Sequence, residues 1–196
     1  EEVISLMPDG TVEDARKAID AAEKAQNQWE RTPSIERAAY LTKIAAGIRK
    51  REKELTDIIV REGGKTQGLA NVEVLFTADY MDYMAGWARR YEGEIIPSDR
   101  PHENIFLFKR PIGVTTGILP WNFPFFLVAR KAAPALITGN TIVIKPSQLT
   151  PENAYVFAQI VEEAGLPAGV FNLVNGRGCV IGHELAANPK VGMVSL

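Results

Sequence analysis

Beyond Pro111 the chain alternates between short apolar runs and longer stretches with helical periodicity. The apolar runs are continuous rather than alternating with polar residues, which is typical of strands in a parallel sheet that is covered on both faces. This pattern predicts an α/β fold with part of a Rossmann-like, doubly wound sheet. We expect strands at 114–119, 141–145, 170–174 and 191–196, and helices at 123–137, 151–164 and 179–187.

The first half of the chain has a different character, since residues 1–97 carry 32 of the 46 charged side chains. A capping box at Thr11 to Asp14 predicts a helix that runs to about residue 31. Ser34 is expected to cap a second helix ending at Gly63-Gly64, and a third helix is expected over about 66–91. The predicted apolar side of this third helix consists of Val72, Leu75, Phe76, Tyr80, Tyr83, Met84 and Trp87.

Composition excludes several classes of protein. A net charge of -2 offers no basic field for nucleic acid, and no apolar run reaches the roughly 18 residues that span a bilayer. The first residues lack a basic segment of the kind that begins a signal peptide. One cysteine and two distant histidines predict neither an internal disulfide nor a metal site. We therefore expect a cytoplasmic protein without membrane or nucleic-acid partners.

Three polar or glycine-rich segments follow predicted strands, and the carboxyl ends of parallel strands are where such sheets bind ligands. They are 120–124, 145–148 and 175–178. Asn122 lies in the first, beside a helix N-terminus where anions are stabilised. By itself, an asparagine at such a turn is more often a helix cap than a functional group. Lys145 ends an apolar strand and is expected to reach solvent or a ligand.

The run Gly117-Ile-Leu-Pro-Trp-Asn-Phe-Pro124 resembles a signature of the aldehyde dehydrogenase superfamily, whose members oxidise aldehydes to acids with NAD(P)+. Two further runs are similar to the superfamily's next motifs in the same order, Ile142 to Ser147 and Gly165 to Val174. The resemblance covers the whole chain. Its first half looks most like bacterial lactaldehyde dehydrogenases, which implies a small hydroxyaldehyde such as lactaldehyde as substrate.

The resemblance assigns roles to individual residues. It implies that Asn122 is catalytic, because its side-chain amide would stabilise the oxyanion of a cysteine thiohemiacetal. Gln148 departs from the glutamate that many NAD-preferring members carry, so NAD is expected with NADP tolerated. Arg177 could favour a phosphate or be simply solvated. The residues expected to bind the cofactor are Ile118, Leu119, Pro120, Trp121, Lys145, Ser147, Gln148, Gly178 and Gly182.

The resemblance also divides the chain into three parts. Residues 1–93 are expected to be the helical N-terminal part of the cofactor-binding domain, and 112–196 the first half of its Rossmann-like sheet. Between them, 94–111 is expected to form a β-arm used in oligomerisation, with strands at 94–96 and 105–110. Residues 105–108 are apolar on both faces, so we expect another element or subunit to cover them. A homodimer or homotetramer follows for the intact enzyme.

The superfamily's nucleophilic cysteine and general-base glutamate belong to motifs expected after Leu196, so these 196 residues are expected to lack dehydrogenase activity alone. Cys179 is at a predicted helix start, which lowers a thiol pKa, but no histidine or glutamate is placed by sequence to activate it. A different class stays open: a short, non-catalytic nucleotide-binding or subunit-assembly module. A relative that transfers its acyl group to coenzyme A is a third possibility.

Overall fold

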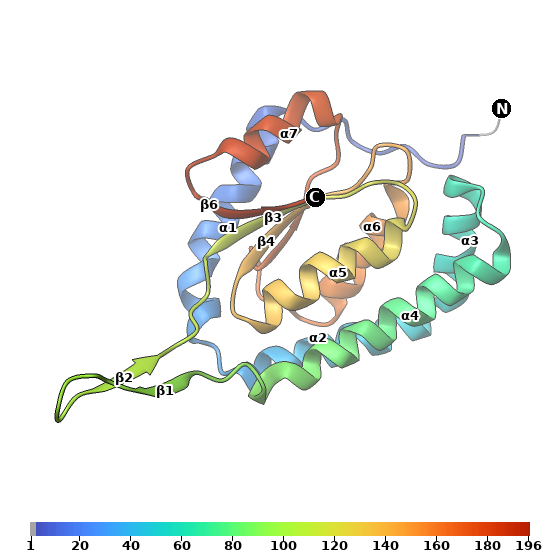
Figure 1. The fold of residues 1–196 in the computed structure, drawn as a ribbon. Coiled ribbons are helices and arrows are strands. Elements are labelled where there is room, and N and C mark those ends of the chain that lie inside the picture. Colours follow the sequence, from blue (N-terminus) through green and yellow to red (C-terminus); the bar gives the residue numbers. More distant parts are fainter. Residues whose placement is uncertain (1–2) are drawn as a thin grey trace.

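The structure is a computed structural model that describes residues 3–196. At its centre is a parallel sheet in the order β5-β4-β3-β6 (Figure 1). The register pairs Ile118 with Lys145, so the strand ends that carry the predicted site residues are neighbours. The predicted sheet is therefore confirmed. Its strands are β3 (Val114–Ile118), β4 (Thr141–Lys145), β5 (Phe171–Leu173) and β6 (Val191–Ser195).

Helices cover both faces of this sheet, as a doubly wound fold requires (Figure 1). On one face α5 (Pro124–Ile137) and α6 (Glu152–Glu163) pack through a large apolar core that includes Phe125 and Phe157. On the other face α1 (Val12–Arg31) and α7 (Gly178–Ala187) form a smaller core around Val143. The continuous apolar character of β4 follows from this double cover.

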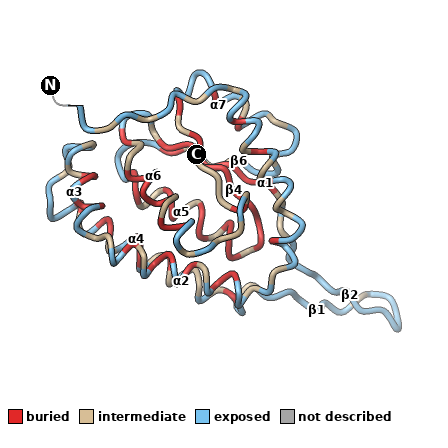
Figure 2. Tube along the Cα trace, turned by 180° about the vertical axis from the view of Figure 1, so that it is seen from behind, coloured by how far each residue is buried: buried red, intermediate tan, exposed pale blue. Residues whose placement is uncertain are grey.

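An outer layer of helices lies against α5 and α6. It consists of α2 (Ser34–Lys50), α3 (Glu52–Gly63) and α4 (Gln67–Ala85), followed by the 3-10 turn η1 (Gly86–Arg89). Figure 2 shows that the buried sides of these helices face inward. Within residues 3–196, no helix is both long enough and apolar enough to cross a membrane.

The predicted helix from Ser34 to Gly63 is wrong, because two helices meet at Arg51. The backbone of Arg51 leaves the helical region (φ -103°, ψ 19°), and its guanidinium binds Glu54 of α3 and Gln159 of α6. No proline or glycine lies at this break, and the Arg51 side chain there also contacts Gln159, 108 residues away in sequence. Ser34 does not cap either: Pro33 is the N-cap of α2 and provides no side-chain hydrogen bond.

The predicted third helix is also corrected, both in length and in which side is buried. It ends as an α-helix at Ala85, before Gly86, a poor helix former, and tightens into η1. Its buried residues are Ala70, Glu73, Val74, Thr77, Ala78 and Met81, whereas Val72, Phe76 and Tyr83 of the predicted apolar side are exposed. Small residues face α2 and α5 because they let the helix axes approach closely.

The two remaining strands form an antiparallel hairpin that projects from the body of the molecule (Figure 1). They are β1 (Glu94–Pro97) and β2 (Asn104–Leu107), so the second strand is shorter than the predicted 105–110. All eight residues are exposed, and nothing in the described chain covers Ile105 to Phe108. The expected cover by a second subunit stays a prediction.

Candidate functional site

The turn between β3 and α5 carries Asn122 on the surface of the molecule. Leu119 is buried and its amide donates to the carbonyl of Lys145 at 2.9 Å, which ties this turn to the neighbouring strand. Ile118 is half-buried, and Pro120, Trp121 and Asn122 are all exposed. The structure thus places Asn122 and the adjoining predicted residues at the carboxyl edge of the sheet. Within the described residues, the Asn122 side chain makes no hydrogen bond that caps α5.

Helix α5 is instead capped from another helix. Its N-cap is Phe123 and its first residue is Pro124, which has no amide hydrogen. The next two amides, those of Phe125 and Phe126, donate to Oε1 of Glu73 on α4 at 3.0 and 3.1 Å. The alternative of Asn122 as the helix cap is therefore wrong, because a buried carboxylate from 52 residues earlier accepts these hydrogen bonds.

Lys65 completes this arrangement. Its ammonium lies 2.5 Å from the second carboxylate oxygen of Glu73 and donates to the backbone carbonyl of Asn122 at 2.9 Å. The same nitrogen lies 3.9 Å from the centre of the Phe123 ring, a cation–π contact. The Glu73 side chain is fully buried and that of Lys65 is 16% exposed, so water screens the pair little.

The second turn, after β4, begins with Lys145. Sequence predicted that its charge would reach solvent or a ligand, but the side chain is buried. Its ammonium donates to the carbonyls of Pro146 at 2.6 Å and Gly176 at 3.1 Å, which joins the ends of β4 and β5. Burial lowers the pKa of this ammonium below its usual range. Lys145 is therefore a charge held at the edge of the sheet by neutral carbonyl groups.

A hollow of about 170 Å³ opens beside this lysine. Ser147 and Gln148 line one side, and the opposite side includes Arg177 and Asp9, whose side chains form an exposed ion pair at 3.2 Å. Sequence did not single out Asp9, which lies 168 residues before Arg177 and carries no motif. The hollow therefore presents hydroxyl, amide, cationic and anionic groups.

Gly178 and Gly182 form one side of the first turn of α7. A Cβ added at either position would meet no atom within 4 Å, so the helix surface is open there. The N-terminus of α7 has no side-chain cap. Neither glycine lines the hollow beside Lys145, so the structure places them next to the other predicted cofactor residues rather than among them.

Helix α6 begins with a second carboxylate cap. Glu62, near the end of α3, accepts hydrogen bonds from the amides of Glu152 at 2.8 Å and Asn153 at 3.4 Å, and from the Asn153 side chain at 3.1 Å. Burial raises the pKa of this carboxyl group, an effect that the backbone hydrogen bonds only partly offset. Among the described residues, the groups that shift the pKa of Glu62 include no cation.

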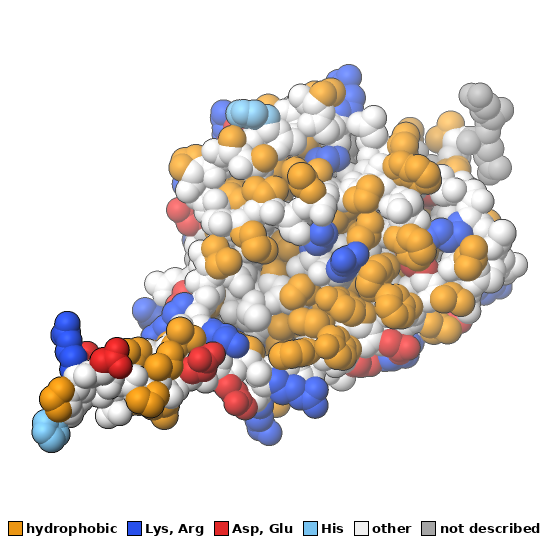
Figure 3. Space-filling model, in the orientation of Figure 1, with side chains coloured by type: hydrophobic (Ala, Val, Ile, Leu, Met, Phe, Trp, Pro, Cys, Tyr) orange, Lys and Arg blue, Asp and Glu red, His pale blue; other side chains and the backbone are white. Residues whose placement is uncertain are grey.

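A larger hollow of about 450 Å³ lies next to Asn122. Its apolar part is aromatic, with Phe76 and Phe126 in contact at 4.7 Å between ring centres. Figure 3 shows hydrophobic side chains gathered on this face, over α4 and α5. Arg130 and Lys131 add charge to the lining. The arrangement can hold a small organic molecule with its polar end at Asn122.

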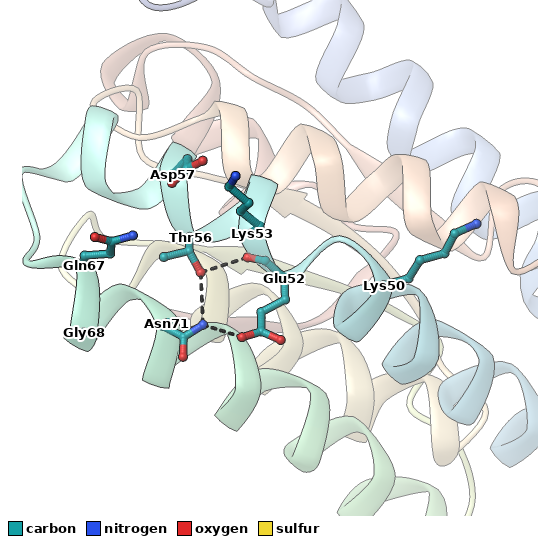
Figure 4. Close-up of a pocket in the computed structure, with 8 residues that line it drawn as sticks. All are labelled: Lys50, Glu52, Lys53, Thr56, Asp57, Gln67, Gly68 and Asn71. Carbon is teal, nitrogen blue, oxygen red and sulfur yellow. Dashed lines mark hydrogen bonds between the residues drawn. The ribbon is translucent and has the colours of Figure 1, made fainter.

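A hollow of about 740 Å³, more spacious than the two at the strand ends, lies elsewhere, between α3 and α4 (Figure 4). Its polar groups satisfy one another: the Asn71 amide donates to Glu52 at 2.6 Å, and the Thr56 hydroxyl donates to the carbonyl of Glu52 at 2.8 Å. Lysines and acidic residues alternate around an open, shallow surface. It has no connection with the strand ends, and we do not assign it a ligand.

Cys179 is exposed in the first turn of α7. Over residues 3–196 there is no group of three or more His, Cys, Asp or Glu side chains that could hold a metal ion. His183, on the same helix, is exposed.

Three charged residues of the outer helical layer were also missed by the motifs. Glu62 and Lys65 flank a glycine pair that the sequence indicated only as a helix end, which Gly64 indeed forms with φ 65°. Glu73 is an acidic residue on the buried side of α4, where most of the other buried residues are small. An acidic residue on such a side was the available signal, since a buried carboxylate needs a partner.

Comparisons with known proteins agree with this fold. The sequence profile of the aldehyde dehydrogenase family matches residues 1–196. Lactaldehyde dehydrogenase of Escherichia coli strain K12 is 72% identical over the whole chain, which spans 41% of that relative. A crystal structure of lactaldehyde dehydrogenase from E. coli superposes with a TM-score of 0.97 at 73% identity, covering 99% of this chain and 41% of the other.

A more distant structure is that of the glyceraldehyde-3-phosphate dehydrogenase GapN from Methanocaldococcus jannaschii, complexed with NADP. It superposes with a TM-score of 0.94 at 38% identity and covers all of this chain and 43% of that one. The chain thus spans about two fifths of the length of the relatives that it matches. With a match along its full length, the chain belongs to the aldehyde dehydrogenase family.

Proposed function

We propose that this chain, as part of a longer polypeptide, takes part in the NAD(P)+-dependent oxidation of a small hydroxyaldehyde to its carboxylic acid. A cysteine and a glutamate outside these residues would form and hydrolyse the thioester. The observation that carries the proposal is the position of Asn122 at the carboxyl edge of the sheet, exposed beside the aromatic hollow and held by its backbone.

The role of Asn122 is to donate its side-chain N–H to the oxygen that becomes negative when a thiolate attacks an aldehyde. Because Lys65 holds the backbone carbonyl and Glu73 takes the helix amides, the side chain of Asn122 remains available to a ligand. A donor that is already oriented needs no rearrangement as the charge develops.

The residues after β4 and β5 fit one half of a nicotinamide dinucleotide, which supplies the hydride acceptor when bound. Ser147 and Gln148 can bind ribose hydroxyl groups, and Lys145 keeps the two turns at a fixed separation. Gly178 and Gly182 leave the surface of α7 open to close approach. Gln148 is neutral, so it does not repel a 2′-phosphate, and use of both NAD+ and NADP+ is proposed.

The substrate class rests on the 72% identity to a lactaldehyde dehydrogenase. The exposed β1–β2 hairpin supports assembly into a homodimer or homotetramer, because Ile95 is 72% exposed and Phe108 is 72% exposed. Such apolar side chains on an unpaired hairpin favour pairing with another chain. This hairpin is also the observation that favours an assembly module as a second candidate function.

The test is oxidation of lactaldehyde by the longer polypeptide, with Asn122→Ala as the variant. We expect kcat to fall by about 10²–10³, the usual cost of one oxyanion donor. The Kd for NAD+ should stay unchanged, because Asn122 does not line the hollow beside Lys145. Asn71→Ala, in the distant groove between α3 and α4, is the control and should leave kcat unchanged. Wild-type turnover by Asn122→Ala would refute the assigned role.

A further inference from the structure

The turn that carries Asn122 has few interactions of its own that would fix its conformation. Residues 120–123 are exposed and irregular, and the N-cap of α5 makes no side-chain hydrogen bond. A catalytic amide must nevertheless be held to within about 0.5 Å of its working position. The support must therefore come from residues outside the turn.

Two side chains of the outer helical layer supply it. Glu73 satisfies the two amides of the first turn of α5 that have no other acceptor, since Pro124 has no N–H and the amide of Leu127 already donates to Phe123 at 3.0 Å. This fixes the downstream side of the turn. The geometry is that of a helix cap provided by a different helix.

Lys65 fixes the upstream side. Its ammonium has three contacts, with the Glu73 carboxylate, the Asn122 carbonyl and the Phe123 ring. A carbonyl held at 2.9 Å sets the orientation of the peptide plane after Asn122 and, with it, the direction of the Asn122 side chain. One nearly buried charge pair thus holds both sides of the turn.

We propose that Lys65 and Glu73 are positioning residues for the side-chain amide of Asn122, and we call them the Lys65–Glu73 clamp. The inference rests on the proposed oxyanion role of Asn122. The clamp touches only the turn and not the hollow beside Lys145, so it should control the chemical step rather than cofactor binding.

The variant that tests the clamp is the double substitution Lys65→Met/Glu73→Gln. The side-chain amide oxygen introduced at position 73 can still accept from the amides of Phe125 and Phe126, and no unpaired charge is left in the interior. The hold on the Asn122 carbonyl is lost. Glu62→Gln is the matched control, because it makes the same chemical change in the cap of α6, which does not touch Asn122.

In the longer polypeptide, kcat for aldehyde oxidation should fall by about 10- to 100-fold in the double variant, the range expected when a catalytic group is displaced by less than about 1 Å. KM and the Kd for NAD+ should change by less than about threefold, and Glu62→Gln should leave kcat unchanged. Adding Asn122→Ala to the double variant should cause no loss beyond that of Asn122→Ala alone. Multiplying losses would overturn the proposal, because the clamp would then act independently of Asn122.

A second measurement does not depend on activity. In the longer polypeptide labelled with 15N at its asparagines, the side-chain amide of Asn122 should give one sharp pair of NMR signals in the wild type and in Glu62→Gln. It should broaden or average in the double variant. Unchanged Asn122 signals in the double variant would overturn the clamp even if activity fell. Should Asn122→Ala leave kcat intact, the proposed function fails, while the NMR result still decides whether the clamp orders the turn.

Discussion

The first backbone amides of α5 and of α6 find their hydrogen-bond acceptors in two different settings. Each helix follows a parallel strand, and each has its first amides satisfied by a glutamate from the outer helical layer, Glu73 for α5 and Glu62 for α6. Glu73 is paired with Lys65, whereas Glu62 accepts hydrogen bonds, has no cation among the described groups that shift its pKa, and has a raised pKa. The ammonium of Lys65 also donates to the Asn122 carbonyl. A carboxylate that caps a helix can thus also help to orient a residue of the preceding turn, when a cation paired with the carboxylate binds that turn.

The sharpest way to break this comparison is to remove each carboxylate. Glu73→Ala leaves the nearly buried Lys65 without its partner and two amides without an acceptor. We expect a loss of about 3–5 kcal/mol in the free energy of unfolding. Glu62→Ala removes hydrogen bonds and, within residues 3–196, leaves no partner cation of the kind seen at Glu73, so about 1–3 kcal/mol is expected. Urea unfolding measures both, and equal losses would mean that the ion pair adds nothing.

A second comparison concerns how closely α5 and α6 are packed. A Cβ on Gly117 of β3 would lie 2.7 Å from the end of Ile144 and 3.3 Å from Cβ of Lys131 on α5. Gly117→Ala should therefore cost about 1–3 kcal/mol by overpacking.

Its counterpart is Gly47→Ala on α2, where the new methyl meets a single methyl group of Ile160 on α6 at 2.6 Å. That methyl, Cγ2, is bonded directly to Cβ of the buried Ile160 and cannot move aside on its own, so a gain in helix propensity of about 1 kcal/mol offsets only part of the overpacking, and a net loss of about 1 kcal/mol is expected. Thermal unfolding of both variants tests the comparison; a gain in stability for Gly47→Ala would contradict it.

A further prediction concerns Lys145, the last residue of the strand that precedes α6. Lys145→Met removes a buried charge held only by carbonyls, so stability should be kept or slightly raised. Binding of NAD+ to the longer polypeptide should weaken by roughly tenfold, because the two turns that line the hollow lose their link. Calorimetry gives both quantities, with exposed Lys53→Met as control; unchanged affinity would exclude Lys145 from the cofactor site.

The smallest effect is a pH dependence from Glu62. Its pKa in the folded chain is raised above the ordinary value of 4.5, so the folded state keeps this proton to higher pH than the unfolded chain. The stability that the protonated group contributes is complete below pH 4.5 and is lost as pH rises through the raised pKa. Glu62→Gln should flatten this fall in urea midpoints as pH rises above 4.5. A steeper fall in the variant would contradict the assignment.

Much of the fold was predictable from local pattern. The capping box at Thr11 and Asp14 is present as expected, and the strands after Pro111 lie within one residue of their predicted ends. The errors were in the outer layer. The buried side of α4 is its small-residue side, and the break at Arg51 has no local signal. Side-chain size and long-range contacts, rather than hydrophobicity, decided both.

For the site, sequence found the residues of the strand ends but not those that hold them. Asn122, Lys145 and Ser147 follow apolar strands at positions where a parallel sheet presents ligands, so their neighbourhood was inferable. That Lys145 is buried against two carbonyls was not, because its acceptor Gly176 lies 31 residues away.

The sequence by itself determined the alternation of strands and helices, the parallel sheet, the order of its motifs and the family to which they belong. Only the tertiary structure decided which charged side chains cap α5 and α6 and which of them holds Asn122. The reason is physical: periodicity specifies which face of an element is buried, but a hydrogen bond between residues 52 or 90 positions apart depends on how two helices are set against each other.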